Sequence, residues 1–173
     1  MDVMNNSMLA NAVVALAVVG LLLYRQLTTR RVKTDGGGRM MLILGLIGLL
    51  QLGQFVQNTG WIGALGVGLL VVSLALAAVL GTFRAYSVRV WQTADGAWWR
   101  RGSALTLVLW FVSIGSHFGI DALAVTLAGP GVDMQGLGNA TLLLYLAISL
   151  GLQNILVAHR VTEYDRERHS VAR

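Results

Sequence analysis

The sequence predicts an all-α membrane protein, a polytopic helix bundle that crosses the bilayer five times. Apolar residues make up 55% of the 173 residues and charged residues only 12%, about half the share of a soluble domain. The 13 basic residues fall in three clusters, and long stretches without Lys or Arg separate them. Such a chain has too little polar surface to coat a soluble globule. We therefore expect one transmembrane domain, residues 1–173.

The positions of the spans follow from the stretches between the basic clusters. A helix needs about 20 apolar residues to cross ~30 Å of hydrocarbon. Residues 1–24 therefore hold one span, 40–83 hold two around the turn Gln57-Asn58-Thr59-Gly60, and 102–159 hold two around Gly129-Pro130-Gly131. The predicted spans are 7–24, 40–57, 61–83, 103–121 and 138–158. The loops 25–39 and 84–102 and the tail 159–173 carry the basic clusters.

The basic clusters also predict the orientation of the chain. Each cluster follows an odd-numbered span or precedes an even-numbered one, so all 13 basic residues lie on one side of the membrane. The positive-inside rule makes that side the cytoplasm, with the N-terminus outside and the C-terminus inside. A cleavable signal peptide would carry a basic start, whereas residues 1–7 carry only Asp2, so 7–24 is predicted to stay as a span. The net charge of +5 is interpreted as this topology signal and as a match to anionic lipid, not as a nucleic-acid interface.

The two loops on the basic side differ in character. Asp35-Gly36-Gly37-Gly38 predicts a flexible connector in the first loop. In the second loop, two runs rich in Val and Trp flank Asp95-Gly96, which predicts a short β-hairpin. A tryptophan ring favours the headgroup region and an arginine favours lipid phosphate, so the hairpin is expected to lie on the inner leaflet or to serve as a docking patch for a partner. The residues proposed for this surface are Arg84, Arg89, Trp91, Trp98, Trp99, Arg100 and Arg101.

The second loop also carries a family resemblance. The run from Arg84 through Val88-Arg89-Val90-Trp91, Asp95-Gly96, Trp99-Arg100-Arg101-Gly102 and Leu109-Trp110 resembles the CcdC-like integral membrane proteins of bacteria. Tyr24-Arg25-Gln26-Leu27, with Arg30 and Val32, is similar as well. The resemblance implies a multi-pass protein of the bacterial cytoplasmic membrane and supplies no activity. The family name hints at cytochrome c maturation, but a chain without Cys cannot itself carry out thiol–disulfide exchange.

Several polar side chains fall inside the predicted spans, where they are costly unless they face the bundle interior. At 1.5 Å per residue, Gln51 lies ~18 Å and Gln54 ~22 Å from the inner surface when counted from Arg39, and His117 lies at a similar depth. These depths predict a polar pocket in the outer half of the bundle. Three interpretations stay open: hydrogen bonds between helices, a site for a small ligand or lipid headgroup, and a transport path. The candidate ligand-binding residues are Asn11, Gln51, Gln54, His117, Asp121 and Tyr145.

No cofactor, metal site or catalytic constellation is predicted. Haem ligation by His117 would need a second ligand, but His159 lies at the opposite face of the membrane and His169 lies in the tail. The chain has neither a metal-ligand spacing nor a nucleophile motif. We therefore expect that the protein is not an enzyme.

The remaining signal is a literal G-x-x-x-G, Gly115 to Gly119, which permits close helix packing either inside the chain or in a homo-oligomer. Taken together, the sequence favours a non-enzymatic accessory or assembly partner of another membrane complex. The competing hypothesis is a binding or transport protein that uses the outer polar pocket. In both cases the lipid bilayer is a partner, and nucleic acid is not.

Overall fold

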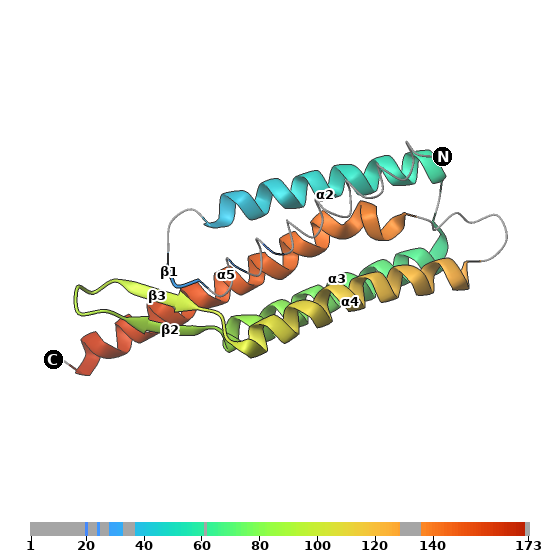
Figure 1. Cartoon of the computed structure of the whole chain (residues 1–173). Coiled ribbons are helices and arrows are strands. Elements are labelled where there is room, and N and C mark those ends of the chain that lie inside the picture. The colour runs from blue at the N-terminus through green and yellow to red at the C-terminus, as the bar shows by residue number, and fades with distance from the viewer. Residues whose placement is uncertain are drawn as a thin grey trace, which may run out of the picture.

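The computed structural model describes residues 28–32, 37–60, 62–128 and 136–171, together with Gly20 and Tyr24. The long helices lie side by side, and a small sheet lies at one end of the molecule, which we call the sheet end (Figure 1). The helices are α2 (Gly37–Thr59), α3 (Gly63–Ser87), α4 (Ala104–Leu127) and α5 (Leu137–Val171). The strands are β1 (Arg30–Arg31), β2 (Arg89–Gln92) and β3 (Trp98–Arg101).

The helices α2–α5 are each long and apolar enough to cross a membrane. They confirm the prediction of a helical membrane bundle at four of the five expected spans, and we describe the chain as a multi-pass membrane protein. The turn predicted at 57–60 is confirmed only at its end: Gln57, Asn58 and Thr59 still belong to α2, and Gly60 adopts φ +82°. The span predicted at 7–24 and the turn at 129–131 lie outside the described residues.

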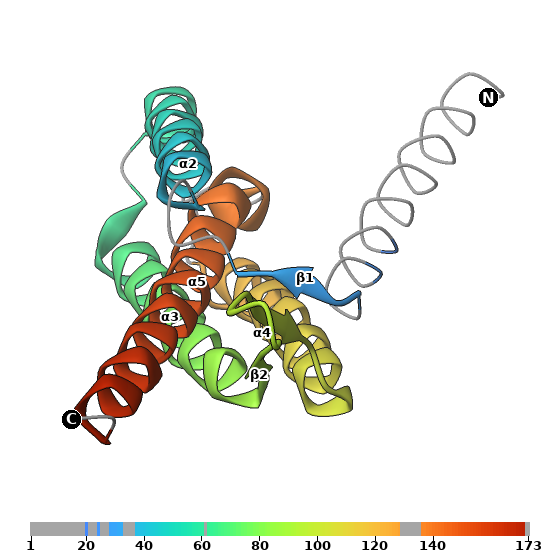
Figure 2. The same cartoon turned by 90° about the vertical axis from the view of Figure 1, so that its left-hand side faces the viewer.

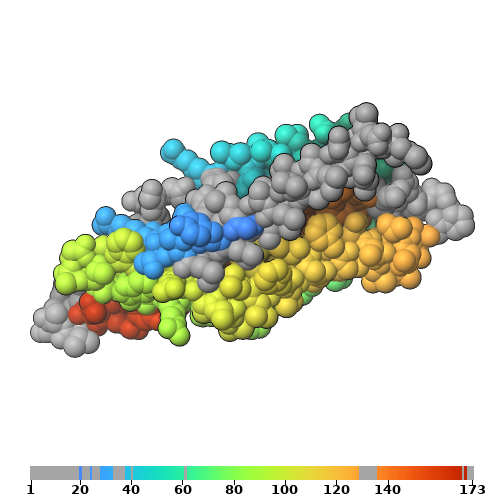
Figure 3. All heavy atoms as spheres, in the orientation of Figure 1, coloured from blue at the N-terminus to red at the C-terminus, as the bar shows by residue number. Residues whose placement is uncertain are grey.

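Helix α5 is the central element of the bundle. It packs against α2, α3 and α4, and Figure 2 shows it between α2 on one side and the pair α3 and α4 on the other. Figure 3 shows α2, in cyan, and α4, in yellow and orange, along opposite edges of one face. Glycines let α2 and α3 approach the backbone of α5 closely. A Cβ added at Gly48 of α2 would lie 2.5 Å from the backbone N of Leu144, and one added at Gly81 of α3 would lie 2.5 Å from the carbonyl oxygen of Ser149.

The sheet has three antiparallel strands in the order β1-β3-β2. The predicted hairpin is confirmed: Thr93 N donates to Ala97 O at 2.9 Å, and Gly96 takes φ +79° in the turn. The flexible connector predicted at 35–38 is wrong at Gly37 and Gly38, which already belong to α2, while Asp35 and Gly36 lie outside the described residues. In the same loop Arg30–Arg31 pairs with β3, which the sequence did not predict. A two-residue strand gives no local signal, since the partner that stabilises it lies about 70 residues further along the chain.

The tail expected after residue 158 is a continuation of α5, which runs on to Val171. This extension supports the sheet: the Trp98 indole donates to Asp165 Oδ1 at 3.0 Å and stacks on Tyr164 with 5.9 Å between ring centroids. Arg160 Nη1 donates to Ala85 O at 2.7 Å and so ties the extension to the end of α3. The sheet is therefore held against the helices and is not a lone hairpin.

Candidate functional site

The structure brings together three of the predicted pocket residues, His117, Asp121 and Tyr145, between α4 and α5. His117 Nε2 lies 3.0 Å from Gly138 O, and Nδ1 lies 3.3 Å from Ser73 Oγ on α3. A carbonyl oxygen only accepts, so in the neutral imidazole Nε2 donates to Gly138 O while Nδ1 accepts from the Ser73 hydroxyl. The imidazole therefore links three helices with both of its nitrogens.

Tyr145 completes this cluster from the next turns of α5. Its hydroxyl donates to Ser113 O at 2.9 Å and lies 2.8 Å from Ser113 Oγ. Its ring centroid is 4.6 Å from that of His117, and both side chains are buried. The polar groups thus satisfy one another inside the bundle, as buried polar groups in membranes must.

Asp121 caps the beginning of α5. Its Oδ1 accepts from the backbone N of Gly138 at 2.6 Å, where a carboxylate is favoured by the unpaired N–H groups and the helix dipole. A Cβ added at Gly138 would lie 2.5 Å from Asp121 Cγ, so the carboxylate reaches the backbone only because residue 138 is Gly. The sequence did not indicate that Ser73 and Gly138 belong to this cluster, because serine and glycine are common in apolar helices.

The cluster leaves little room for a ligand. The cavity beside it measures about 10 Å³ and is lined by Ser73, His117, Asp121, Gly138, Thr141 and neighbouring aliphatic residues. That volume is at the lower limit for one water molecule. Among the described residues, the cluster is therefore a closed hydrogen-bonded junction between helices and not an open pocket.

The other predicted pocket residues do not join the cluster. Gln51 and Gln54 are exposed on α2, because α2 turns Leu52, Phe55 and Val56 toward the core instead. Asn11 lies outside the described residues. The depth estimates placed these groups at one level, but depth does not fix the rotation of a helix about its own axis.

Arg84 does not lie on the expected surface, since its side chain is fully buried at the sheet end of α3. Its guanidinium stacks over the Trp110 ring at 4.4 Å and donates through Nη2 to the Ser149 hydroxyl. Within the described part of the chain, its Nε and Nη1 have no hydrogen-bond partner. Three helices thus meet around one buried cation.

The sheet has two different faces, because side chains alternate along a strand. Trp98 and Arg100 face α5: Trp98 bonds Asp165, and Arg100 Nη1 donates to Asn154 Oδ1 at 2.7 Å. Burial and the charge of Arg30, its cross-strand neighbour, lower the pKa of Arg100 below its ordinary value. At the hairpin turn, a hydrogen bond from the Thr93 side chain lowers the pKa of the exposed Asp95.

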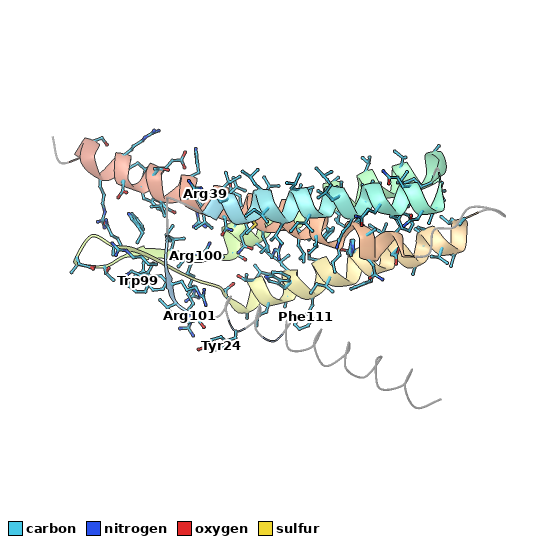
Figure 4. All side chains as sticks on the ribbon, turned by 90° about the horizontal axis from the view of Figure 1, so that it is seen from above. Tyr24, Arg39, Trp99, Arg100, Arg101 and Phe111 are labelled. Carbon is cyan, nitrogen blue, oxygen red and sulfur yellow. The ribbon has the colours of Figure 1, made fainter. Side chains whose placement is uncertain are left out.

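The opposite face of the sheet, which we call the basic-aromatic face, points away from α5. Cross-strand register places Trp91 beside Trp99 and Arg89 beside Arg101. Figure 4 shows Trp99 and Arg101 on the side of the sheet away from α5. Trp91 is 38% exposed, and Arg89 and Arg101 are exposed as well. The face comprises Arg31, Arg89, Trp91, Trp99 and Arg101.

Two further sequence features have clear positions. Gly115 and Gly119 lie on the exposed side of α4, with nothing among the described residues within 4 Å of an added Cβ. His159 is exposed on α5 and lies 3.4 Å from Glu163. The described residues contain no group of three His, Cys, Asp or Glu side chains that could hold a metal ion.

In comparisons with protein-family models, curated proteins and solved structures, nothing matches this chain.

Proposed function

We propose that the protein is a non-enzymatic membrane protein that assembles with another membrane complex through its basic-aromatic face. The observation that carries this proposal is the cross-strand pairing of Trp91 with Trp99 and of Arg89 with Arg101 on a sheet held by α5. Trp91 and both arginines are exposed, and Trp99 is half-buried beside them. Trp and Arg are the side chains most enriched at the centres of protein interfaces. A sheet held by α5 presents them without the ordering cost of a loose loop.

The polar cluster supports an accessory role and not ligand binding. His117, Asp121 and Tyr145 are engaged with neighbouring helices, and the cavity beside them has the volume of about one water. A binding or transport protein would need space at this level. The cluster therefore serves to position α4 against α5.

The proposed setting is the cytoplasmic membrane of a bacterium, in keeping with the resemblance to the CcdC-like proteins. Residues 7–24 form a fifth span in this proposal, with the N-terminus outside and the sheet in the cytoplasm. The orientation is supported by the positions of the described basic residues, which lie at the sheet end (Figure 1). At this end α2 and α4 begin, and α3 and α5 end. Under the positive-inside rule this end faces the cytoplasm.

The experiment is a comparative purification from cells in mild detergent. The wild-type chain is expected to recover a partner membrane protein in fixed proportion. The double variant Arg89→Glu with Trp91→Ala, which changes two exposed positions, is expected to lose that partner while keeping its yield. Both side chains lie outside the bundle core, so the packing of the helices is expected to be kept.

A matched control separates docking from a general charge effect. Arg166→Glu reverses a charge at an exposed position of α5 that is not part of the basic-aromatic face, and it is expected to retain the partner. Repeated recovery of the wild-type chain alone would contradict the proposal. If the double variant recovered as much partner as the wild type, the docking site would lie outside the basic-aromatic face, which would also contradict the proposal.

A further inference from the structure

A second feature of the molecule is an apolar groove between α2 and α5, on the part of these helices toward the sheet end. Its volume is about 870 Å³, within the roughly 300–1,000 Å³ typical of ligand sites. Leu42, Leu46 and Leu49 line it on α2, and Ile148, Leu152 and Ile155 line it on α5. These walls are aliphatic, so the groove suits a hydrocarbon chain.

The groove exists because α2 and α5 diverge toward the sheet end. Among the described glycines of α2, Gly48 lies closest to α5, since an added Cβ there would be 2.5 Å from Leu144 N. At Gly45 the added Cβ would be 3.7 Å from Ala147, and at Gly151 it would be 3.8 Å from Met41. Beyond this point the groove extends to Gly38 and Ala158.

The length of the groove matches one leaflet of a bilayer. From Arg39 to Leu49 the helix rises ~15 Å, which is half of the ~30 Å hydrocarbon thickness. The groove thus begins at the level of the basic residues and ends near the middle of the membrane. A single lipid tail has this reach.

Positive charge lies at the sheet end of the groove. Arg39 shares one face of α2 with Leu42, Leu46 and Leu49, at spacings of three, four and three residues. Asn154 lines the groove and accepts a hydrogen bond from Arg100, whose guanidinium is therefore close by. Figure 4 shows Arg39 and Arg100 at the same end of the bundle. An anionic headgroup would complement both cations.

We propose that this groove binds one anionic glycerophospholipid from the leaflet at the sheet end. One acyl chain lies between α2 and α5, and the phosphate faces Arg39 and the Asn154–Arg100 pair. Arg100 uses the oxygen of Asn154, so the amide nitrogen of Asn154 can donate to the headgroup. The site adds to the proposed docking function and does not depend on it.

The test reconstitutes the full chain in vesicles of phosphatidylethanolamine and phosphatidylglycerol, extracts it in mild detergent and counts retained lipids by native mass spectrometry. The wild-type chain is expected to retain one phosphatidylglycerol. Arg39→Gln is expected to reduce the preference for phosphatidylglycerol about fivefold, the effect of one basic residue near an anionic headgroup. Leu46→Trp, at a position 61% exposed, narrows the groove and is expected to abolish retention.

Two variants control for charge and bulk. Arg166→Gln removes an exposed charge from α5 outside the groove, and Ile43→Trp adds the same bulk at an exposed position of α2 outside the groove. Both variants are expected to retain phosphatidylglycerol as the wild-type chain does. Equal retention by Leu46→Trp and Ile43→Trp, or no lipid preference in the wild type, would overturn the proposal.

The absence of Cys allows the other occupants to be tested directly. Oxidation of the pair Ala17→Cys with Leu46→Cys is expected to give no internal disulfide, and Leu46→Cys alone is expected to give no disulfide-linked dimer. An internal cross-link would show that residues 7–24 fill the groove, and a dimer would show that a second copy does. Either result would refute the lipid site.

Discussion

At the scale of single residues, Arg84 is the most unusual group in the bundle. A buried guanidinium normally has a carboxylate beside it, whereas Arg84 meets the Trp110 ring and the Ser149 hydroxyl. Removing a guanidinium from water is costly, so each hydrogen bond or ring contact that Arg84 makes in the interior stabilises the fold more than it would in water. Ser149 is the one hydrogen-bond acceptor seen for this guanidinium in the described part of the chain.

The prediction at this scale is a coupling between these two residues. Ser149→Ala leaves a third guanidinium nitrogen without a partner and is expected to cost about 1–3 kcal/mol of stability. In an Arg84→Met background the same Ser149→Ala change is expected to cost almost nothing, because the cation is gone. The measurement is the thermal unfolding midpoint in detergent micelles, followed by Trp fluorescence. An equal loss in both backgrounds would rule out the coupling.

At the scale of elements, the positions of the helices depend on a few glycines. Gly48 on α2 and Gly81 on α3 place these helices against α5 from two sides. Other glycines in the same helices make no such contact: Gly53 and Gly68 have nothing within 4 Å of an added Cβ among the described residues. The number of glycines in a span therefore does not reveal which of them carry the packing.

The prediction for the elements compares two glycines of one helix. Gly48→Ala forces Leu144 away from α2 and is expected to destabilise the fold by about 1–3 kcal/mol, as overpacking does. Gly53→Ala adds the same methyl group in open space and is expected to gain about 0.5–1 kcal/mol through helix propensity. Unfolding midpoints of the two variants in the same detergent check the sign of each change. Similar behaviour of both would show that α2 does not pack on α5 at Gly48.

At the scale of the whole molecule, α5 unites the membrane-spanning bundle with the sheet. One part of it contacts α2, α3 and α4. Its extension holds the sheet through the bond between Trp98 and Asp165, and it holds the end of α3 through Arg160. A surface carried by such a helix moves with the bundle and not independently of it. The orientation of the bundle therefore decides which compartment the basic-aromatic face meets.

The prediction for the whole molecule concerns this orientation. Because the chain has no Cys, Asn6→Cys and Ala94→Cys provide single reactive sites near the N-terminus and at the exposed hairpin turn. In intact cells, a membrane-impermeant maleimide is expected to label Asn6→Cys and to leave Ala94→Cys unlabelled until the membrane is opened. Labelling of Asn6→Cys only after opening would contradict the five-span topology and leave the partner and lipid experiments unaffected.

The structure brings some of the residues predicted for the pocket together and leaves others apart. His117, Asp121 and Tyr145 meet because two of them share a face of α4 and the third lies at a matching depth on α5. Gln51 and Gln54 do not join them, because the rotation of α2 follows the contact of Gly48 with Leu144. Arg84 looked like a loop arginine, yet α3 continues to Ser87 and turns it inward.

The sequence alone determined the membrane-spanning helices and the hairpin, because apolar length, basic clusters and the Asp95-Gly96 turn are local signals. Only the tertiary structure decided the rest: the strand β1, the extension of α5 under the sheet, the closed polar cluster and the groove beside α2. Each of these depends on contacts between residues far apart in the chain. Such contacts are set by the rotation and crossing of helices, which hydropathy and charge do not encode.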